Sequence, residues 1–199
     1  MIARDKFFAA YKEQFGAPTA AQKAGLDRLL TFLEGDEKMT DPRYQAYALA
    51  TCWRETGQKY EPVTEYGPRA YFNKYEPCTA KGKELGNKSP GDGFKYRGRG
   101  YAQITGLDNY ERFELLLGVS LLEHPENALD PSVAYRILSL GLVRGMFTRK
   151  CLSHYFTETG SDWVGARHCV NGTDHDKEVG EAGQKFLTCI LAASVDTRP

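Results

Sequence analysis

The most informative stretch of the chain reads Gly98-Arg99-Gly100-Tyr101-Ala102-Gln103-Ile104-Thr105-Gly106-Leu107-Asp108-Asn109-Tyr110. It combines glycines, which allow sharp bends and close backbone approach, with amide side chains, a hydroxyl and two tyrosines. Amides and aromatic rings suit a sugar, which carries hydroxyl groups at its rim and apolar C–H bonds on its faces. Upstream, the motif Trp53-Arg54-Glu55-Thr56-Gly57 places a carboxylate at the end of a predicted helix. Together the two motifs predict a cleft that binds and cuts a polysaccharide.

Composition limits the class of protein and its partners. The chain has 199 residues, 41% of them hydrophobic, which is enough for one domain spanning residues 1–199 with a real core. Its 26 basic and 26 acidic residues leave no net charge, so bulk electrostatics favours neither nucleic acid nor an anionic membrane as a partner. The first residues contain no continuous apolar run, and we therefore expect no secretory signal peptide and no membrane insertion.

Cysteine and histidine spacing bears on cofactors. The five cysteines are widely spaced and lack a C-x-x-C pair, which argues against a zinc ribbon or a dense disulfide framework, and we expect mostly buried free thiols. The run Asp174–Glu178 has a hint of calcium-loop spacing, but Val179 stands where an EF-hand needs glycine. The histidines show no acceptable ligand spacing. We therefore expect no metal and no organic cofactor.

Hydrophobic periodicity predicts helices on both sides of an irregular middle segment. Phe7 to Phe15 follow helical spacing, with Gly16 as a stop. A capping box at Thr19–Gln22 begins a second helix, and Asp41-Pro42 begins a third that runs to about Thr56. Gly57 is the expected stop of this third helix.

Helical patterns resume after the middle segment. Tyr110, Phe113, Leu116 and Leu117 line a short helix that ends at Gly118, and Asp130-Pro131 cap a longer one. That longer helix is expected to carry the apolar residues Ala134, Ile137, Leu138 and Met146. Asp162 to Cys169 are expected to be helical, and Asp174 to cap a final helix with Val179, Phe186 and Ile190 facing inward. Between the two sets of helices, residues 57–105 are rich in glycine, proline and tyrosine, which predicts ordered loops with a short hairpin that form the cleft.

Two carboxylates are candidates for catalysis. Hydrolysis of a glycosidic bond needs one protonated carboxyl to release the leaving oxygen and a second, ionised one to activate water or to attack. Glu55 is the candidate acid, because it shares a helix face with the small residues Ala48 and Cys52 and lies at the negative end of the helix dipole. Glu65, on the following loop, is the candidate for the second role, and Glu61 competes with it.

A set of motifs in one order resembles family-19 glycoside hydrolases, which include plant-type chitinases and bacteriophage endolysins. The motifs that carry the resemblance are Arg54-Glu55-Thr56, Glu65-Tyr66-Gly67, Leu85-Gly86-Asn87, Gly91-Asp92-Gly93, Tyr96-Arg97-Gly98-Arg99-Gly100, Gln103-Ile104-Thr105, Asn109-Tyr110 and Val170-Asn171-Gly172-Thr173-Asp174. The resemblance runs from about Tyr44 to Phe186, and the chain is most similar to the compact phage and prophage members.

The resemblance implies a mainly α-helical, lysozyme-like fold of two lobes with the cleft between them, and an inverting mechanism. It implies that Glu55 is the general acid, Glu65 the general base and Thr105 the hydroxyl that helps to hold the attacking water. The amides that bind sugar match Gln103, Asn109 and Asn171, and Tyr96 matches an aromatic residue of the cleft. An inverting enzyme seats a water between its two carboxyl groups, which sets them roughly 6.5–9.5 Å apart.

One position departs from the family pattern. Members usually carry histidine before the catalytic glutamate, where this chain has Arg54. Neighbouring helical residues point about 100° apart, so Arg54 need not touch the Glu55 carboxylate. If it did, it would weaken Glu55 as an acid.

The resulting hypothesis is a peptidoglycan-degrading endolysin that hydrolyses β-1,4 bonds and acts as a monomer on the glycan strands. It would be made in the bacterial cytoplasm and reach the cell wall with a holin-like or secretion partner. A secreted antibacterial effector would look the same from sequence. The alternatives are a chitinase acting on β-1,4-linked N-acetylglucosamine and a non-catalytic glycan-binding protein in which Arg54 marks a lost acid function.

Overall fold

The computed structural model describes residues 1–194 and is mainly helical, as the sequence predicts. Its contacts divide the chain into two compact units. Unit 1 comprises Met1–Tyr60 and the chain from Leu138 onward, and unit 2 comprises Glu61–Ile137. The boundary at Ile137 falls within helix α7 (Pro131–Arg144). No helix in the described range is long and apolar enough to cross a membrane.

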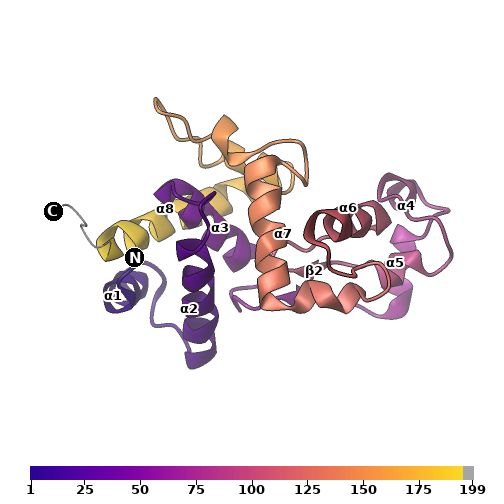
Figure 1. The fold of residues 1–199 in the computed structure, drawn as a ribbon, viewed down its shortest axis with the longest axis horizontal. Helices are drawn as coiled ribbons and strands as arrows, with labels where there is room; N and C mark the ends of the chain where they lie inside the picture. The colour runs from indigo at the N-terminus through magenta and orange to yellow at the C-terminus, as the bar shows by residue number, and fades with distance from the viewer. Residues whose placement is uncertain (195–199) are drawn as a thin grey trace. The chain divides into compact units, whose positions relative to one another are not determined.

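Unit 1 contains the longer helices, and α2 and α3 begin at the predicted capping signals (Figure 1). Besides the second half of α7, its elements are α1 (Arg4–Phe15), α2 (Ala20–Glu34), α3 (Pro42–Glu55), η3 (Leu152–His154), η4 (Gly165–Cys169) and α8 (Asp176–Ala193). Thr19 and Gln22 form the capping box of α2, and the Asp41 side chain accepts the Arg43 N–H at the start of α3. Gly57 follows α3 with a φ of 58°, a left-handed conformation that suits glycine.

The core of unit 1 forms where α8 packs against α1 and α3 (Figure 1). The Phe15 ring lies 4.6 Å from the Phe186 ring and 4.8 Å from the Tyr11 ring, measured between centroids. Val179, Phe186 and Ile190 are buried, as the predicted inward face requires. The five cysteines are all free, and Cys52, Cys169 and Cys189 are buried.

The predicted boundaries of two long helices are wrong. Helix α7 ends at Arg144, and Gly145 follows with a φ of 66°, so Met146 lies beyond the helix. The last helix begins at Asp176 and its N-cap is His175, with a φ of 57°, instead of Asp174. The Asp174 carbonyl accepts a hydrogen bond from the Arg167 side chain, so Asp174 belongs to the turn before the helix.

Unit 2 is built from short elements. Besides the first half of α7, these are β1 (Val63–Thr64), η1 (Arg69–Tyr75), α4 (Ala80–Glu84), α5 (Asp92–Lys95), β2 (Arg99–Gly100), α6 (Leu107–Leu117) and η2 (Pro125–Leu129). Strands β1 and β2 pair antiparallel, with Val63 opposite Gly100 and Thr64 opposite Arg99. Strands β1 and β2 do not form a hairpin, because η1, α4 and α5 lie between them. Within the predicted loop segment, an antiparallel bridge between Arg99 and Ile104 closes a short turn.

A close backbone contact explains the Gly91-Asp92-Gly93 motif of unit 2, and side-chain hydrogen bonds explain the Leu85-Gly86-Asn87 motif. A side chain at Gly93 would place its Cβ 2.6 Å from the Phe72 carbonyl oxygen, a distance that side chains do not tolerate. The Asn87 side chain donates to the Tyr75 carbonyl and accepts the Leu107 N–H. These residues join η1 and α6 to the segment between them and so give the middle segment its order.

Candidate functional site

Glu55 is the last residue of α3, and its side chain is 18% exposed. Ala48 and Cys52 are buried on the same helix, as the predicted face requires. Burial and the neighbouring Glu55 charge raise the pKa of the Cys52 thiol well above its ordinary value. The Glu55 carboxylate therefore borders the core of unit 1, and most of its surface is covered by neighbouring side chains.

A buried arginine contacts the Glu55 carboxylate. Arg167, on η4, is 2% exposed and places Nη1 2.8 Å from Glu55 Oε1. The contact has the distance of an ion pair but lacks the direction of a hydrogen bond. Arg167 Nε donates to the Asp174 carbonyl oxygen at 2.9 Å, which fixes the guanidinium to the turn before α8. The last turn of α3 is thus held against the segment that carries the Val170–Asp174 motif.

Arg54, the departure from the family pattern, has a different partner. Its Nε lies 3.8 Å from Glu178 Oε2, and the same oxygen contacts His175 Nδ1 at 2.8 Å. Among the described residues, Arg167 is therefore the cation that contacts the Glu55 carboxylate. Arg54 instead forms its ion pair with Glu178 on α8. Asn171 is exposed, and its N–H donates to the Arg167 carbonyl.

Glu65 directly follows strand β1, and its backbone N–H donates to the Gly98 carbonyl at 2.8 Å. Both side-chain oxygens have partners: the Gly98 N–H donates to Oε2 and the Tyr75 hydroxyl to Oε1, each at 3.1 Å. Lys74 Nζ lies 3.7 Å from Oε1. A Cβ at position 98 would lie 3.2 Å from the Glu65 side chain and 2.9 Å from Gln103 Oε1. Glycine at this position therefore allows the Glu65 carboxylate and the Gln103 amide to approach the same backbone.

The predicted amide and hydroxyl residues of unit 2 form a hydrogen-bonded chain. Gln103 Nε2 donates to the carbonyls of Val63 and Gly100, which holds Gln103 in a left-handed conformation with a φ of 53°. The Thr105 hydroxyl donates to the Gln103 carbonyl at 3.0 Å, and Asn109 Nδ2 donates to the Thr105 carbonyl at 2.7 Å. Because the Thr105 proton is used in this bond, its oxygen lone pairs remain to accept a hydrogen bond.

Tyr96 lies in the core of unit 2 and is 5% exposed. Its hydroxyl donates to the Leu122 carbonyl at 3.2 Å, and its ring lies 5.3 Å from the Tyr110 ring. The structure gives Tyr96 a packing role and leaves little of its surface for a ligand. A direct contact between this ring and sugar stays a prediction.

Sequence reasoning missed three residues that contact the two glutamates: Arg167, Tyr75 and Lys74. Arg167 was expected only as part of a helix from Asp162 to Cys169, of which the structure forms the 3-10 turn Gly165–Cys169. Arg167 is buried with its neighbours Ala166 and Cys169 and therefore requires a partner, but no local feature of the sequence identifies that partner.

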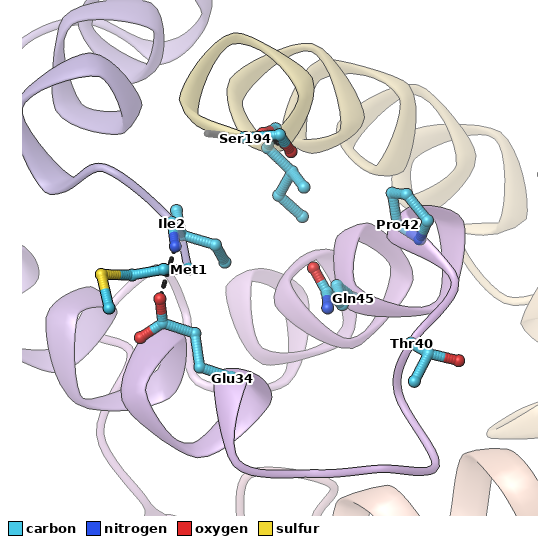
Figure 2. A pocket seen from close by; sticks show the side chains of 8 residues that line it. Met1, Ile2, Glu34, Thr40, Pro42, Gln45 and Ser194 are labelled. Atoms are coloured by element: carbon cyan, nitrogen blue, oxygen red, sulfur yellow. Dashed lines mark hydrogen bonds between the residues drawn. The ribbon is translucent and has the colours of Figure 1, made fainter. Parts of the chain in front are cut away.

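A cavity of about 250 Å³ lies elsewhere in unit 1 (Figure 2). Its lining residues are Met1, Ile2, Glu34, Thr40, Pro42, Gln45, Ile190 and Ser194. The Glu34 carboxylate accepts the Ile2 N–H at its edge, as Figure 2 shows. None of the predicted site residues lines this cavity, so it is not the candidate active site. Within residues 1–194, no group of three or more histidine, cysteine or acidic residues is placed to hold a metal.

Comparisons with known proteins support the resemblance seen in the motifs. No protein-family model matches the chain. A glycosyl hydrolase family 19 domain-containing protein of Haemophilus influenzae is 40% identical over 115 residues, which cover 45% of this chain and 56% of the relative. The chain thus spans little more than half of that relative's length.

Solved structures share the fold. Chitinase C from Streptomyces griseus superposes with a TM-score of 0.56 at 20% identity, covering 96% of this chain and 94% of the chitinase chain. A glutamate-to-glutamine mutant of chitinase C gives a TM-score of 0.54 at 18% identity, with the same coverage of both chains. The mainly helical fold and the resemblance to family-19 glycoside hydrolases are therefore confirmed.

Proposed function

We propose that the protein is a glycoside hydrolase of the family-19 type that cleaves β-1,4 bonds in the glycan strands of peptidoglycan with inversion. The environment of Glu65 is the observation that carries this proposal. Its carboxylate and the Gln103 amide oxygen both border Gly98, and Gln103 leads through hydrogen bonds to Thr105 and Asn109. A carboxylate beside a group of amides and a hydroxyl suits the activation of water next to a sugar.

The proposed mechanism requires Glu55 to take up a proton in the complex with substrate, against the Arg167 cation that contacts its carboxylate in the structure. Glu55 then transfers this proton to the glycosidic oxygen as the bond to the anomeric carbon breaks. Glu65 is ionised and removes a proton from a water molecule, which attacks the anomeric carbon from the opposite face. Thr105 accepts a hydrogen bond from that water, since its own proton is donated to Gln103. The product then has the inverted anomeric configuration, and the mechanism requires carboxyl groups roughly 6.5–9.5 Å apart.

The preference for peptidoglycan rests on the resemblance to phage and prophage members. We propose that the protein acts as a monomer at the cell wall and reaches it through a holin-like or secretion partner. Chitin is the second candidate substrate, because both solved neighbours are named chitinases. The two substrates share β-1,4-linked N-acetylglucosamine and differ in the muramic acid and peptides of the cell wall.

The test compares purified peptidoglycan with colloidal chitin as substrates. We expect the wild-type protein to release reducing ends from peptidoglycan, with product of inverted configuration in NMR spectra taken early in the reaction. Glu55→Gln should abolish release while keeping glycan binding. Mass analysis of the fragments identifies the bond cleaved.

Three outcomes separate the alternatives. Faster release from chitin than from peptidoglycan would identify a chitinase. Product that retains its configuration would exclude the inverting mechanism. Equal binding by the wild type and Glu55→Gln, with no release by either, would identify a glycan-binding protein instead of an enzyme.

A further inference from the structure

Three cations of unit 2 are held against aromatic rings. The Arg69 guanidinium carbon lies 4.8 Å from the centroid of the Phe94 ring, and that of Arg97 lies 4.0 Å from the same centroid. Lys74 Nζ lies 3.5 Å from the centroid of the Tyr71 ring. Both guanidinium groups therefore lie close to one ring, and each cation has an aromatic support.

The rings that support these cations touch one another. Phe72 lies 5.1 Å from Tyr71 and 5.5 Å from Phe94, measured between ring centroids. The three cations are thus linked through one group of rings on η1 and α5, with Arg97 just after α5 and the linking Phe72 ring buried. We call these cations and rings the cation–aromatic cluster, which consists of Arg69, Tyr71, Phe72, Lys74, Phe94 and Arg97.

The acids near the cluster are largely engaged by other groups. Glu76 accepts the Gly91 N–H, and Asp92 accepts the N–H groups of Lys88 and Ser89. Glu65 faces Lys74, but it also accepts bonds from the Tyr75 hydroxyl and the Gly98 N–H. In the described part of the chain, no hydrogen bond or ion pair engages the Arg69 guanidinium.

A further positive charge lies next to the cluster. Arg99 is buried and donates to the carbonyls of Lys95 and Arg97 and to the Tyr110 hydroxyl. Burial and the Arg99 charge lower the pKa of Arg97. An anion placed here would reduce the repulsion between Arg97 and Arg99, which the Glu65 charge offsets only in part.

The cluster is open to solvent where it would meet a ligand. Arg69 and Lys74 are exposed, and 44% of the Tyr71 surface is exposed. A guanidinium that rests on a ring through its face keeps its N–H donors at the edge, in a fork that matches a carboxylate. The support of the ring also lowers the entropy lost when the side chain binds.

We propose that the cation–aromatic cluster binds the carboxylates of peptidoglycan stem peptides and so selects peptide-bearing glycan over neutral chitin. This inference rests on the proposed function, because Lys74 joins the cluster to Glu65, the proposed base. Chitin carries no carboxylates, whereas each stem peptide carries several. A protein with no net charge can then still recognise an anionic wall through one local surface.

Binding of three glycans by Arg69→Gln tests the proposal, in a Glu55→Gln background that cleaves none of them. The probes are soluble peptide-bearing glycan strands, the same strands after amidase removal of the peptides, and neutral N-acetylglucosamine oligosaccharides. We expect Arg69→Gln to weaken binding to the peptide-bearing strands by about fivefold and to leave the neutral oligosaccharides unchanged. The difference in affinity between Arg69→Gln and the background for the peptide-bearing strands should shrink as the salt concentration is raised, because charges at an exposed site are screened.

The matched control is Lys185→Gln, which removes an exposed cation that also lies over a ring, 5.7 Å from the Phe15 centroid in unit 1. It should bind all three probes as the background does. Arg97→Gln repeats the test with a second member of the cluster, and thermal melting checks that loss of its bond to the Phe94 carbonyl leaves the protein folded.

Three results would overturn the proposal. They are equal weakening on neutral oligosaccharides, equal weakening on the strands without peptides, and no weakening on the peptide-bearing strands. Failure of the proposed function is a separate result, since it is measured as absent bond cleavage by the wild-type protein, whereas this test measures binding alone.

Discussion

Unit 1 holds Glu55 at the end of a 14-residue helix, whereas unit 2 holds Glu65 directly after a two-residue strand. The helix of Glu55 packs on α8, and one buried side chain, Arg167, contacts its carboxylate. Glu65 has no long element behind it, and backbone and side-chain donors from Gly98 and Tyr75 hold both of its oxygens. A carboxylate is therefore positioned by packing in one unit and by hydrogen bonds in the other.

This difference predicts different costs of substitution. In unit 1, removal of Arg167 leaves the Glu55 carboxylate without its charged partner next to the core. In unit 2, several modest hydrogen bonds share the task, and each should contribute little by itself.

Replacement of the proposed base in unit 2 should have the largest effect. Glu65→Gln keeps the shape of the side chain but cannot accept a proton from water, and kcat should fall by about 10³-fold. Thermal melting should change little, because the amide oxygen can still accept one bond. Glu61→Gln is the matched control and should keep most of the activity. If Glu61→Gln lost most of the activity while Glu65→Gln kept it, Glu61 would be the general base.

Removal of the cation in unit 1 should mainly lower stability. Arg167→Met should reduce the free energy of unfolding by about 3 kcal/mol, because a buried ion contact is broken and the Glu55 carboxylate loses its partner. Arg54→Met, which breaks only a 3.8 Å contact at the surface, should cost less than about 1 kcal/mol. Urea unfolding measures both values. An equal loss of stability in the two variants would show that the burial of Arg167 does not determine how much it contributes to the free energy of unfolding.

The sequence predicted unit 1 far better than unit 2, and the reason is physical. The caps at Thr19 and Asp41 and the stop at Gly57 are local signals, read within one helical turn, and the structure forms them as expected. Strands β1 and β2 are only two residues long and pair across an intervening segment, so their register carries no local pattern. For the same reason, the glycine-rich and proline-rich sequence between them predicts loops where the structure forms short helices.

The residues that contact the two glutamates were equally hard to predict, because local sequence patterns do not reveal contacts between distant residues. Motif order placed Glu55 and Glu65 among the candidates, but no local signal connects Glu55 to Arg167, which comes from a distant part of the chain. Tyr75 is ten residues from Glu65 and meets it only because η1 turns back. The roles of all seven predicted site residues stay predictions, and the variants proposed here address those of Glu55 and Glu65.

Alkaline pH should lower stability through the buried tyrosines of both units. Burial raises the pKa of Tyr47 and Tyr60 in unit 1, and it raises the pKa of Tyr110 in unit 2 to about 12. An unfolded tyrosine loses its proton near pH 10, so above that pH the unfolded chain binds fewer protons than the folded one. Stability should therefore be unaffected below about pH 10 and fall above it by up to about 1.4 kcal/mol per pH unit for each such tyrosine.

Urea unfolding at several pH values, with tyrosinate absorbance followed in parallel, measures this loss. Tyr110→Phe should make the decline above about pH 10 less steep, because one group that titrates differently in the two states is removed. Tyr66→Phe is the control, since Tyr66 is 97% exposed. A decline of the same slope in both variants would show that Tyr110 does not contribute.

The smallest effect should come from one hydrogen bond to Glu65. Tyr75→Phe removes the hydroxyl that donates to Oε1 at 3.1 Å, while the Gly98 N–H still holds Oε2. We expect kcat to fall by less than about tenfold, KM to stay near its wild-type value, and stability to fall by about 1 kcal/mol. Tyr155→Phe, in unit 1, removes a hydroxyl remote from Glu65 in the chain and should leave kcat unchanged. If Tyr75→Phe lowered kcat as much as Glu65→Gln does, a single bond would position the base, and the contrast between the two units would fail.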